Sequence, residues 1–316
     1  MFRNKQVDAI VKIFSEGNDM YENHHEIIPF LKEMAKDKKI LYDIIKYNLD
    51  QPAFLKRVRH YSTLSMDIIE TPNFTFVVNI FPSLPDKNED ISFQSVHHHG
   101  NMLLSTIGSF GPGYKAITFK KDFQIEKNTG LTIMSKEKVY QNTVHNFDFI
   151  DANTPHIVFY PSGISATYAL WSNKTKTNTG SRLKKIPLIA KFKKQLRTII
   201  EILGIEKLAG INKLEYLDFY PKDGKLVAMK QRIHYNSAEG SNDNFIQNIF
   251  HFIQKTGFND NTFLKMIEAK NTTPEFAEVC INDLIEGRKI DDQFVNGFLN
   301  IDKVNLDYLA VINATN

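Results

Sequence analysis

Apolar side chains recur every three or four residues through the first part of the chain, which is the spacing of one face of an α-helix. The pattern is interrupted by charged residues at 36–39 and gives way to a different one after residue 70. We therefore expect residues 5–70 to be helical and to form short amphipathic helices. The four segments expected are 7–14, 27–34, 40–47 and 52–61.

After residue 73 the pattern changes to short aromatic and β-branched runs, separated by turns that contain glycine or proline. Such runs favour β-strands, and their turns mark where each strand ends. About nine short strands of this kind indicate a closed barrel or a sandwich. The expected strands are 74–81, 93–99, 103–108, 115–119, 131–135, 138–144, 146–150, 156–160 and 166–172.

A polar linker at residues 174–181 leads to a second region of helical spacing. We expect a helix at 187–203, a hairpin of strands 214–220 and 226–234 turning at Asp223-Gly224, a helix at 245–255, and two or three more helices in 261–316. The fold class is then α+β, with three parts. These are a helical N-terminal extension (1–70), a β-barrel (71–175) and a mostly helical C-terminal region with one hairpin (183–316).

Composition narrows the classes of function. The 316 residues are 42% hydrophobic and 24% charged, as in ordinary globular proteins. The 39 basic and 36 acidic residues nearly balance, so we expect no nucleic-acid partner. The single cysteine, Cys280, excludes an internal disulfide framework. No apolar run approaches the roughly 20 residues of a membrane span and no signal-peptide core is present, so we expect a cytoplasmic protein without a membrane partner.

The histidine run His97-His98-His99 is the strongest chemical signal. On a strand, side chains alternate between faces, so His97 and His99 point to one side and His98 to the other. Two neighbouring imidazoles can ligate one transition-metal ion. A third ligand is needed, and the candidates downstream are His156, which opens a strand after a polar turn, and His145, which also precedes a strand.

These motifs carry a resemblance to a known family. The His97-X-His99 strand, the Gly111-Pro112-Gly113 turn and the later Pro155-His156 turn and strand resemble the two motifs of a cupin. The resemblance covers about residues 74–172. It implies a β-barrel of the jelly-roll type with a metal inside it, bound by His97, His99 and His156.

The chain departs from the common cupin pattern at one ligand. Many cupins place a glutamate four or five residues after the second histidine, where this chain has Leu103 and Leu104. Three histidines without a carboxylate resemble the cysteine and thiol dioxygenase group, although no cysteine lies near the barrel to form that group's Cys–Tyr crosslink. The resemblance implies a non-haem Fe(II)-dependent oxygenase, a metal-dependent oxidoreductase acting on a small molecule with O2. Ni, Cu, Zn and Mn are the alternative metals.

Three neutral imidazoles leave the full charge of a divalent ion available to an anionic substrate. Tyr114, Tyr160 and Tyr168, on barrel strands or their rims, are the candidate catalytic residues. Two other functions use the same fold. One is a non-redox isomerase or lyase in which the metal acts as a Lewis acid, and the other is a ligand-binding cupin without turnover.

The remaining histidines and arginines are expected to be structural. We place His24 and His25 in a surface loop or helix cap. The helical extensions are expected to cover the barrel mouth or to form a homodimer interface, with His234 and His251 as structural residues. Arg182 and Arg232 are the arginines that could clamp a substrate carboxylate, although surface arginines are the simpler reading.

Overall fold

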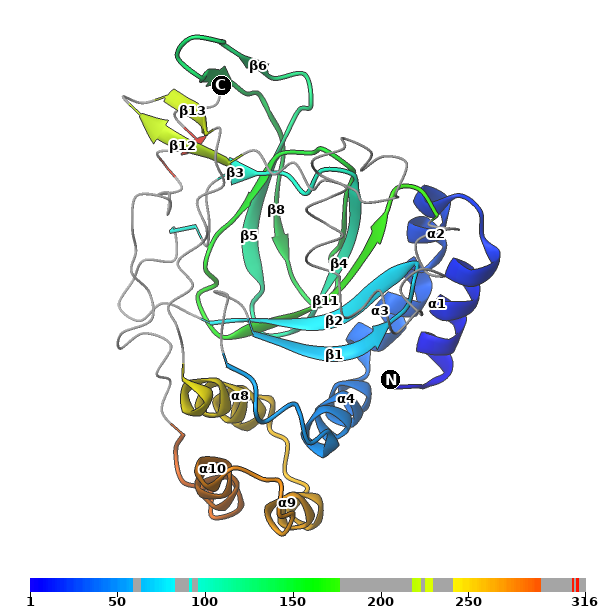
Figure 1. Ribbon diagram of the computed structural model, residues 1–316, viewed down its shortest axis with the longest axis vertical. Coiled ribbons are helices and arrows are strands. Elements are labelled where there is room, and N and C mark those ends of the chain that lie inside the picture. Colours follow the sequence, from blue (N-terminus) through cyan, green and yellow to red (C-terminus); the bar gives the residue numbers. More distant parts are fainter. Residues whose placement is uncertain are drawn as a thin grey trace, which may run out of the picture.

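The computed structural model describes residues 1–58, 64–82, 91–92, 96–176, 218–222, 225–229 and 241–290, together with residues 309, 311 and 312. Within these residues, helices and strands are mixed. The strands lie in the middle of the molecule, with α1–α4 along one side and α8–α10 at the foot (Figure 1).

Four helices form the N-terminal layer, and three of them begin at a residue whose side chain caps the helix. Their bounds are α1 Lys5–Glu16, α2 Met20–Glu26, α3 Ile28–Lys36 and α4 Lys38–Asp50. Asn4 caps α1 by accepting a hydrogen bond from the backbone of Val7, and Asp19 and Asp37 cap α2 and α4 in the same way. The helix expected at 52–61 is wrong for residues 52–56, which form turns, while 59–61 lie outside the described residues.

The segment just before residue 71 is a strand, not a helix. β1 (Leu64–Glu70) pairs antiparallel with β2 (Phe74–Phe81). In β1 the apolar residues Leu64, Met66 and Ile68 alternate with polar ones, which is the period of a strand with one buried face. β1 is as rich in apolar residues as the helices before it. The change from helical to strand spacing is therefore easily missed.

Two antiparallel sheets carry the described strands. The five-stranded sheet has the order β1-β2-β11-β4-β9, and the eight-stranded sheet has the order β6-β7-β13-β12-β3-β10-β5-β8. The further bounds are β3 Val96–His97, β4 Met102–Phe110, β5 Tyr114–Phe119, β6 Gln124–Ile125, β7 Leu131–Ile133, β8 Lys136–Asn142, β9 Phe147–Ile150, β10 His156–Val158, β11 Ser165–Asn173, β12 Asp218–Lys222 and β13 Lys225–Met229.

The two sheets face each other across an internal cavity that both of them line. Among the described strands, no ladder of hydrogen bonds joins the sheets into one ring, so these strands form a sandwich, the second of the two architectures expected. The expected strands between residues 103 and 172 are confirmed within a few residues at their ends. The hairpin expected near Asp223-Gly224 is also present, because β12 and β13 pair antiparallel on either side of it.

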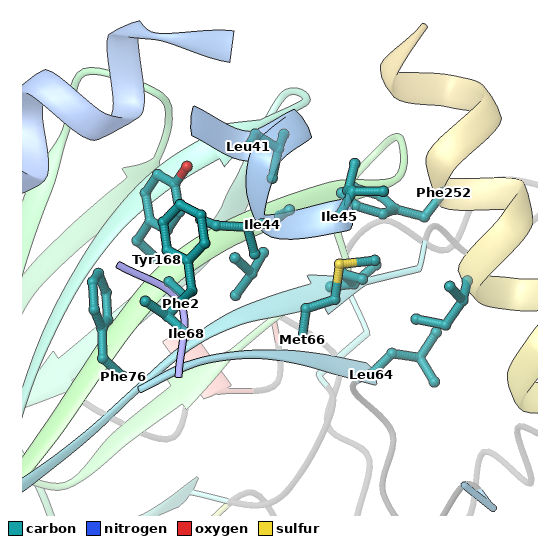
Figure 2. Packing of buried hydrophobic residues seen from close by; sticks show 14 of the residues in the cluster. Phe2, Leu41, Ile44, Ile45, Leu64, Met66, Ile68, Phe76, Tyr168 and Phe252 are labelled. Atoms are coloured by element: carbon teal, nitrogen blue, oxygen red, sulfur yellow. The ribbon is translucent and has the colours of Figure 1, made fainter. Parts of the chain in front are cut away.

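The helices bury the outer face of the five-stranded sheet. Helices α2 and α3 contact β4, and α4 contacts β1. Figure 2 shows Ile44 and Ile45 of α4 facing Met66 of β1, with Tyr168 of β11 close by. All four side chains are buried in one continuous hydrophobic core. Full burial of such a side chain stabilises the fold by about 1.5–3 kcal/mol, so this layer contributes a large part of the stability.

The C-terminal helices extend the same core. Their bounds are α8 Asn242–Thr256, α9 Asn261–Glu268 and α10 Glu275–Ile285. Helix α8 ends at Gly257, whose φ of 78° is the left-handed conformation that favours glycine. His251 of α8 is buried and bonds through Nδ1 to the carbonyl of Ile290, a structural role as expected. None of the helices in the described part of the chain is long and apolar enough to span a bilayer.

Several expectations fall on residues outside the described part of the chain. These are the helix at 187–203, the arginines Arg182 and Arg232, and His234.

His24 is a buried link between the helices and the five-stranded sheet, which corrects its expected place in a surface loop. Its ring lies on α2 with no exposed surface, and its two nitrogens bond to Ser105 Oγ at 2.7 Å and Ser172 Oγ at 2.8 Å. Burial, followed by repulsion from His25, lowers the pKa of His24 to about 3. This role could not be predicted from the sequence, because the two serines that hydrogen-bond to the ring are distant along the chain.

This burial predicts that stability falls as the solution is acidified. The unfolded chain binds a proton at His24 below about pH 6.5 and the folded chain only near pH 3, so the unfolded state gains protons first. The loss from this residue should reach about 2 kcal/mol by about pH 5. Chemical denaturation between about pH 8 and 5 measures how steeply the free energy of unfolding falls with pH. This fall should be smaller in His24→Asn than in the wild type. The exposed His145→Asn variant is the control, and an unchanged slope in His24→Asn would contradict the assignment.

Candidate metal centre

Strand pairing brings two of the three histidines together. β10 pairs antiparallel with β3, and His156 lies directly opposite His97 in that pairing. Directly paired residues project to the same face of a sheet. Their ring centroids are 4.4 Å apart, and both side chains are almost completely buried. Residues nearly sixty positions apart in the sequence therefore meet on the inner face of the eight-stranded sheet.

His99 joins this pair from a loop and not from the strand that was expected. β3 ends at His97, and the chain turns at Gly100, whose φ is 59°. The backbone of Gly100 donates a hydrogen bond to His98 Nδ1 at 3.1 Å, and its carbonyl accepts one from the backbone of Asn153 at 2.7 Å. These bonds fix the loop, and His99 Nε2 lies 3.2 Å from His97 Nε2.

The three rings have the geometry of a metal-binding group. One nitrogen from each of His97, His99 and His156 lies within 4.8 Å of the other two. Two nitrogens that bind one ion at about 2.1 Å, with an angle of roughly 90–110° between them, lie about 3.0–3.4 Å apart. The 3.2 Å separation of the His97 and His99 nitrogens agrees with this. A set of imidazole nitrogens suits Zn, Cu, Fe and Ni.

The surroundings of His156 favour the state that binds a metal. Its Nδ1 bonds to the carbonyl oxygen of Thr154 at 3.0 Å, so this nitrogen carries the proton and Nε2 is left as the donor atom. Burial lowers the pKa of His156 to about 4 against a smaller opposing effect of the Thr154 bond. The ring is therefore neutral at physiological pH, as a ligand must be.

The other two histidines of the sequence analysis lie elsewhere. His145 is exposed in the turn between β8 and β9 and is not part of the group, so of the two candidates for a third ligand only His156 is brought to the site. His98 is buried and accepts a hydrogen bond from the Gly100 backbone, and it is not part of the group.

The three histidines open onto a cavity of about 170 Å³ between the two sheets. Besides the imidazoles, its described lining is apolar or neutral and polar, and no Asp, Glu, Lys or Arg belongs to it. Leu104 contributes an apolar side chain to the lining. The polar lining residues are Asn79, Thr106, Tyr114, Thr167 and Trp171.

A buried hydrogen-bond chain orders the polar wall of this cavity. Asn142 Nδ2 donates to Thr106 Oγ1 at 3.1 Å, and Thr167 Oγ1 donates to Asn142 Oδ1 at 3.2 Å. Thr106 and Thr167 line the same cavity as Tyr114. Gly113, with φ 78°, allows this arrangement, because a Cβ at this position would overlap the Asn142 carbonyl oxygen.

The three candidate catalytic tyrosines occupy different places. Tyr114 lines the cavity, and burial raises the pKa of its hydroxyl, so it keeps its proton. Tyr160 is buried in a small cluster with Tyr114 and Phe81 but does not line the cavity. Tyr168 lies on the opposite face of β11, in the helical core, because the inward residues of that strand are Thr167, Ala169 and Trp171.

The sequence analysis missed Asp148, a carboxylate buried inside the sandwich. It lies opposite Thr106 in the β4–β9 pairing and accepts a hydrogen bond from Lys138 Nζ at 2.6 Å. Because β8 and β9 are edge strands of different sheets, this ion pair connects the two sheets. The alternation of Phe147-Asp-Phe-Ile150 is the signal that could have found it, since it puts Asp148 on the same face as the cavity-lining Ile150.

Comparisons with known proteins return only distant likenesses. No protein-family model matches the chain, and no curated protein matches its sequence. Similar solved structures include the DMSP lyase DddQ from Ruegeria pomeroyi (10% identity, TM-score 0.25, 37% of this chain and 49% of that one). The chain therefore spans about half the length of that lyase.

Two other similar structures are matched over more of their length. TT1209 from Thermus thermophilus has 10% identity and a TM-score of 0.26 over 40% of this chain and 97% of that one. An RmlC-like cupin with a double-stranded β-helix fold from Methanocaldococcus jannaschii has 12% identity and a TM-score of 0.23 over 35% and 81%. TM-scores this low do not establish a shared fold, and the functional conclusion depends on the geometry of the histidines and their cavity.

The position of Tyr168 gives a stability prediction. Its buried hydroxyl has no hydrogen-bond partner, which costs about 1–3 kcal/mol of desolvation. Tyr168→Phe should therefore leave metal binding unchanged and raise the free energy of unfolding by about 1 kcal/mol, as measured by denaturant titration. Tyr42→Phe is the matched control and should destabilise, because the Tyr42 hydroxyl donates to the Thr256 carbonyl at 2.8 Å. Lower stability in Tyr168→Phe would contradict this placement.

Proposed function

We propose that this protein is a cupin-type metalloenzyme, a non-haem Fe(II)-dependent oxygenase that oxidises a small molecule with O2. His97, His99 and His156 are its metal ligands, and the cytoplasm is its compartment. The observation that carries the proposal is the group of three imidazoles at the wall of an internal cavity, with no carboxylate among the described residues that line it.

The ligand set supports metal binding with open coordination positions. Three protein ligands leave room for substrate and a second small molecule on a six-coordinate ion. Three neutral imidazoles cancel none of the ion's charge, so an anionic donor atom of the substrate is held strongly. When bound, Fe(II) supplies the activation of O2 that no protein side chain provides.

The described lining of the cavity offers little acid–base chemistry, which favours oxygenation over the isomerase or lyase alternative. Proton abstraction needs a general base whose pKa lies near the working pH. Apart from the three histidines, the titratable side chain in the described lining is Tyr114, whose pKa is raised by burial. Asp148 is buried nearby but does not line the cavity and is paired with Lys138.

The protein's own residues then have three tasks. The Thr154 carbonyl orients His156 so that Nε2 faces the cavity. The apolar side chains of Leu104 and Ile150 make part of the cavity wall apolar. Tyr114 presents a protonated hydroxyl that can donate a hydrogen bond to substrate.

The first test is metal content. Full-length protein prepared without oxygen and supplied with Fe(II) should contain close to one iron per chain by elemental analysis. His99→Ala should lose at least about tenfold in affinity, because it removes one of three ligands. His145→Ala, an exposed histidine outside the group, is the matched control and should keep its iron. No bound metal in the wild type would refute the metal centre.

Oxygen uptake then separates the candidate functions. Iron-loaded wild type should consume O2 with one or more members of a panel of small anionic substrates, and His99→Ala should not. Product formation without O2 consumption would identify an isomerase or lyase. Binding of metal and ligand with neither product formation nor O2 consumption would identify a binding protein. Each of these two outcomes would refute the oxygenase.

A further inference from the structure

We propose that the cavity selects a small monoanion whose far end carries one neutral hydrogen-bonding group, such as a hydroxyl, and no second charge. The metal holds the anionic end, and the polar wall formed by Tyr114, Thr106, Asn142 and Thr167 receives the neutral end. This inference depends on the proposed metal centre and adds a substrate class to it.

The charge of the described lining argues against a second charged group. A charged end that is buried without a partner is strongly disfavoured, and it is tolerated only beside an opposite charge. The described lining of the cavity contains no Lys or Arg to receive an anion and no Asp or Glu to receive a cation. Asp148, the acidic group buried nearby, already accepts a hydrogen bond from Lys138.

The directions of the hydrogen bonds in the wall determine whether each end of the wall acts as a donor or as an acceptor toward a ligand. Thr167 donates its only hydroxyl proton to Asn142, so its oxygen is left to act as an acceptor. Thr106 accepts from Asn142, and Tyr114 lines the cavity with a hydroxyl that keeps its proton because burial raises its pKa. The Tyr114 proton is then available as a donor. Tyr114 and Thr167 both line the cavity, so the wall ends in a donor on β5 and an acceptor on β11.

A hydroxyl group matches this wall because it can accept from Tyr114 and donate to Thr167. A methyl group would leave both ends without a partner in a buried site, and an ammonium group could not accept from Tyr114. At about 170 Å³ the cavity is smaller than the roughly 300–1,000 Å³ of pockets for drug-sized ligands, so it suits a small ligand.

The test compares three carboxylates of equal length, 3-hydroxypropionate, butyrate and β-alanine, which end in a hydroxyl, a methyl and an ammonium group. Their binding is measured by calorimetry and by the visible spectrum of full-length protein loaded with Co(II), without O2. We expect 3-hydroxypropionate to bind at least about tenfold more tightly than the other two. Malonate, which ends in a second carboxylate, should bind no better than butyrate.

Two variants assign the preference to the wall. Tyr114→Phe should weaken 3-hydroxypropionate by about tenfold and leave butyrate unchanged, because only the hydroxyl ligand uses the donor. Thr167→Val should act in the same direction through loss of the acceptor. Tyr168→Phe makes the same chemical change as Tyr114→Phe on the outer face of the sheet, and it should alter neither affinity.

The possible results are distinct from those of the oxygenase test. Equal affinities for the three carboxylates, tighter binding of β-alanine or malonate, or a preference that survives Tyr114→Phe would each overturn the inference. Absence of Co(II) binding would overturn both proposals. A hydroxyl preference without O2 uptake by the iron form would support this inference and refute the oxygenase. O2 uptake with a doubly charged substrate would support the oxygenase and refute this inference.

Discussion

The structure depends on three strands that are buried on both faces. β2, β4 and β11 turn one set of side chains toward the helical layer and the other set toward the cavity. The outer set, which includes Phe76 and Tyr168, joins the large hydrophobic core. The inner set, which includes Thr106 and Thr167, forms the polar wall. Because the helices shield the outer face, the inner face can carry polar groups without exposing the sheet to water on both sides.

The histidine group shows how a short strand can position a site. β3 has only two described residues, yet its pairing with β10 sets His97 opposite His156, and the turn at Gly100 returns His99 to the same pair. The positions of the three rings are thus set by backbone hydrogen bonds, before any ion contributes. A site that exists before the metal binds loses little conformational entropy on binding, which favours affinity.

Local patterns in the sequence were sufficient for the features that depend on neighbouring residues. The helices near Phe14 and Ile44, most strands, and the histidine group follow from side-chain period and from the motifs around His97 and His156. The features that were missed depend on distant partners. His24 is polar and lies in a polar segment, and only Ser105 and Ser172, far along the chain, make its burial favourable. Tyr168 was assigned to the site because its strand was recognised but the direction of its face was not.

The alternation along β11 also has an evolutionary consequence. Substitutions at Thr167, Ala169 or Trp171 alter the shape and polarity of the cavity, whereas those at Tyr168 or Leu170 alter the packing beneath the helices. The two sets share a strand but few neighbours, so their energetic effects should be nearly additive. Ligand preference can therefore diverge among descendants of this chain by point substitution at little cost to folding. Insertion of a single residue would exchange the two sets and damage both.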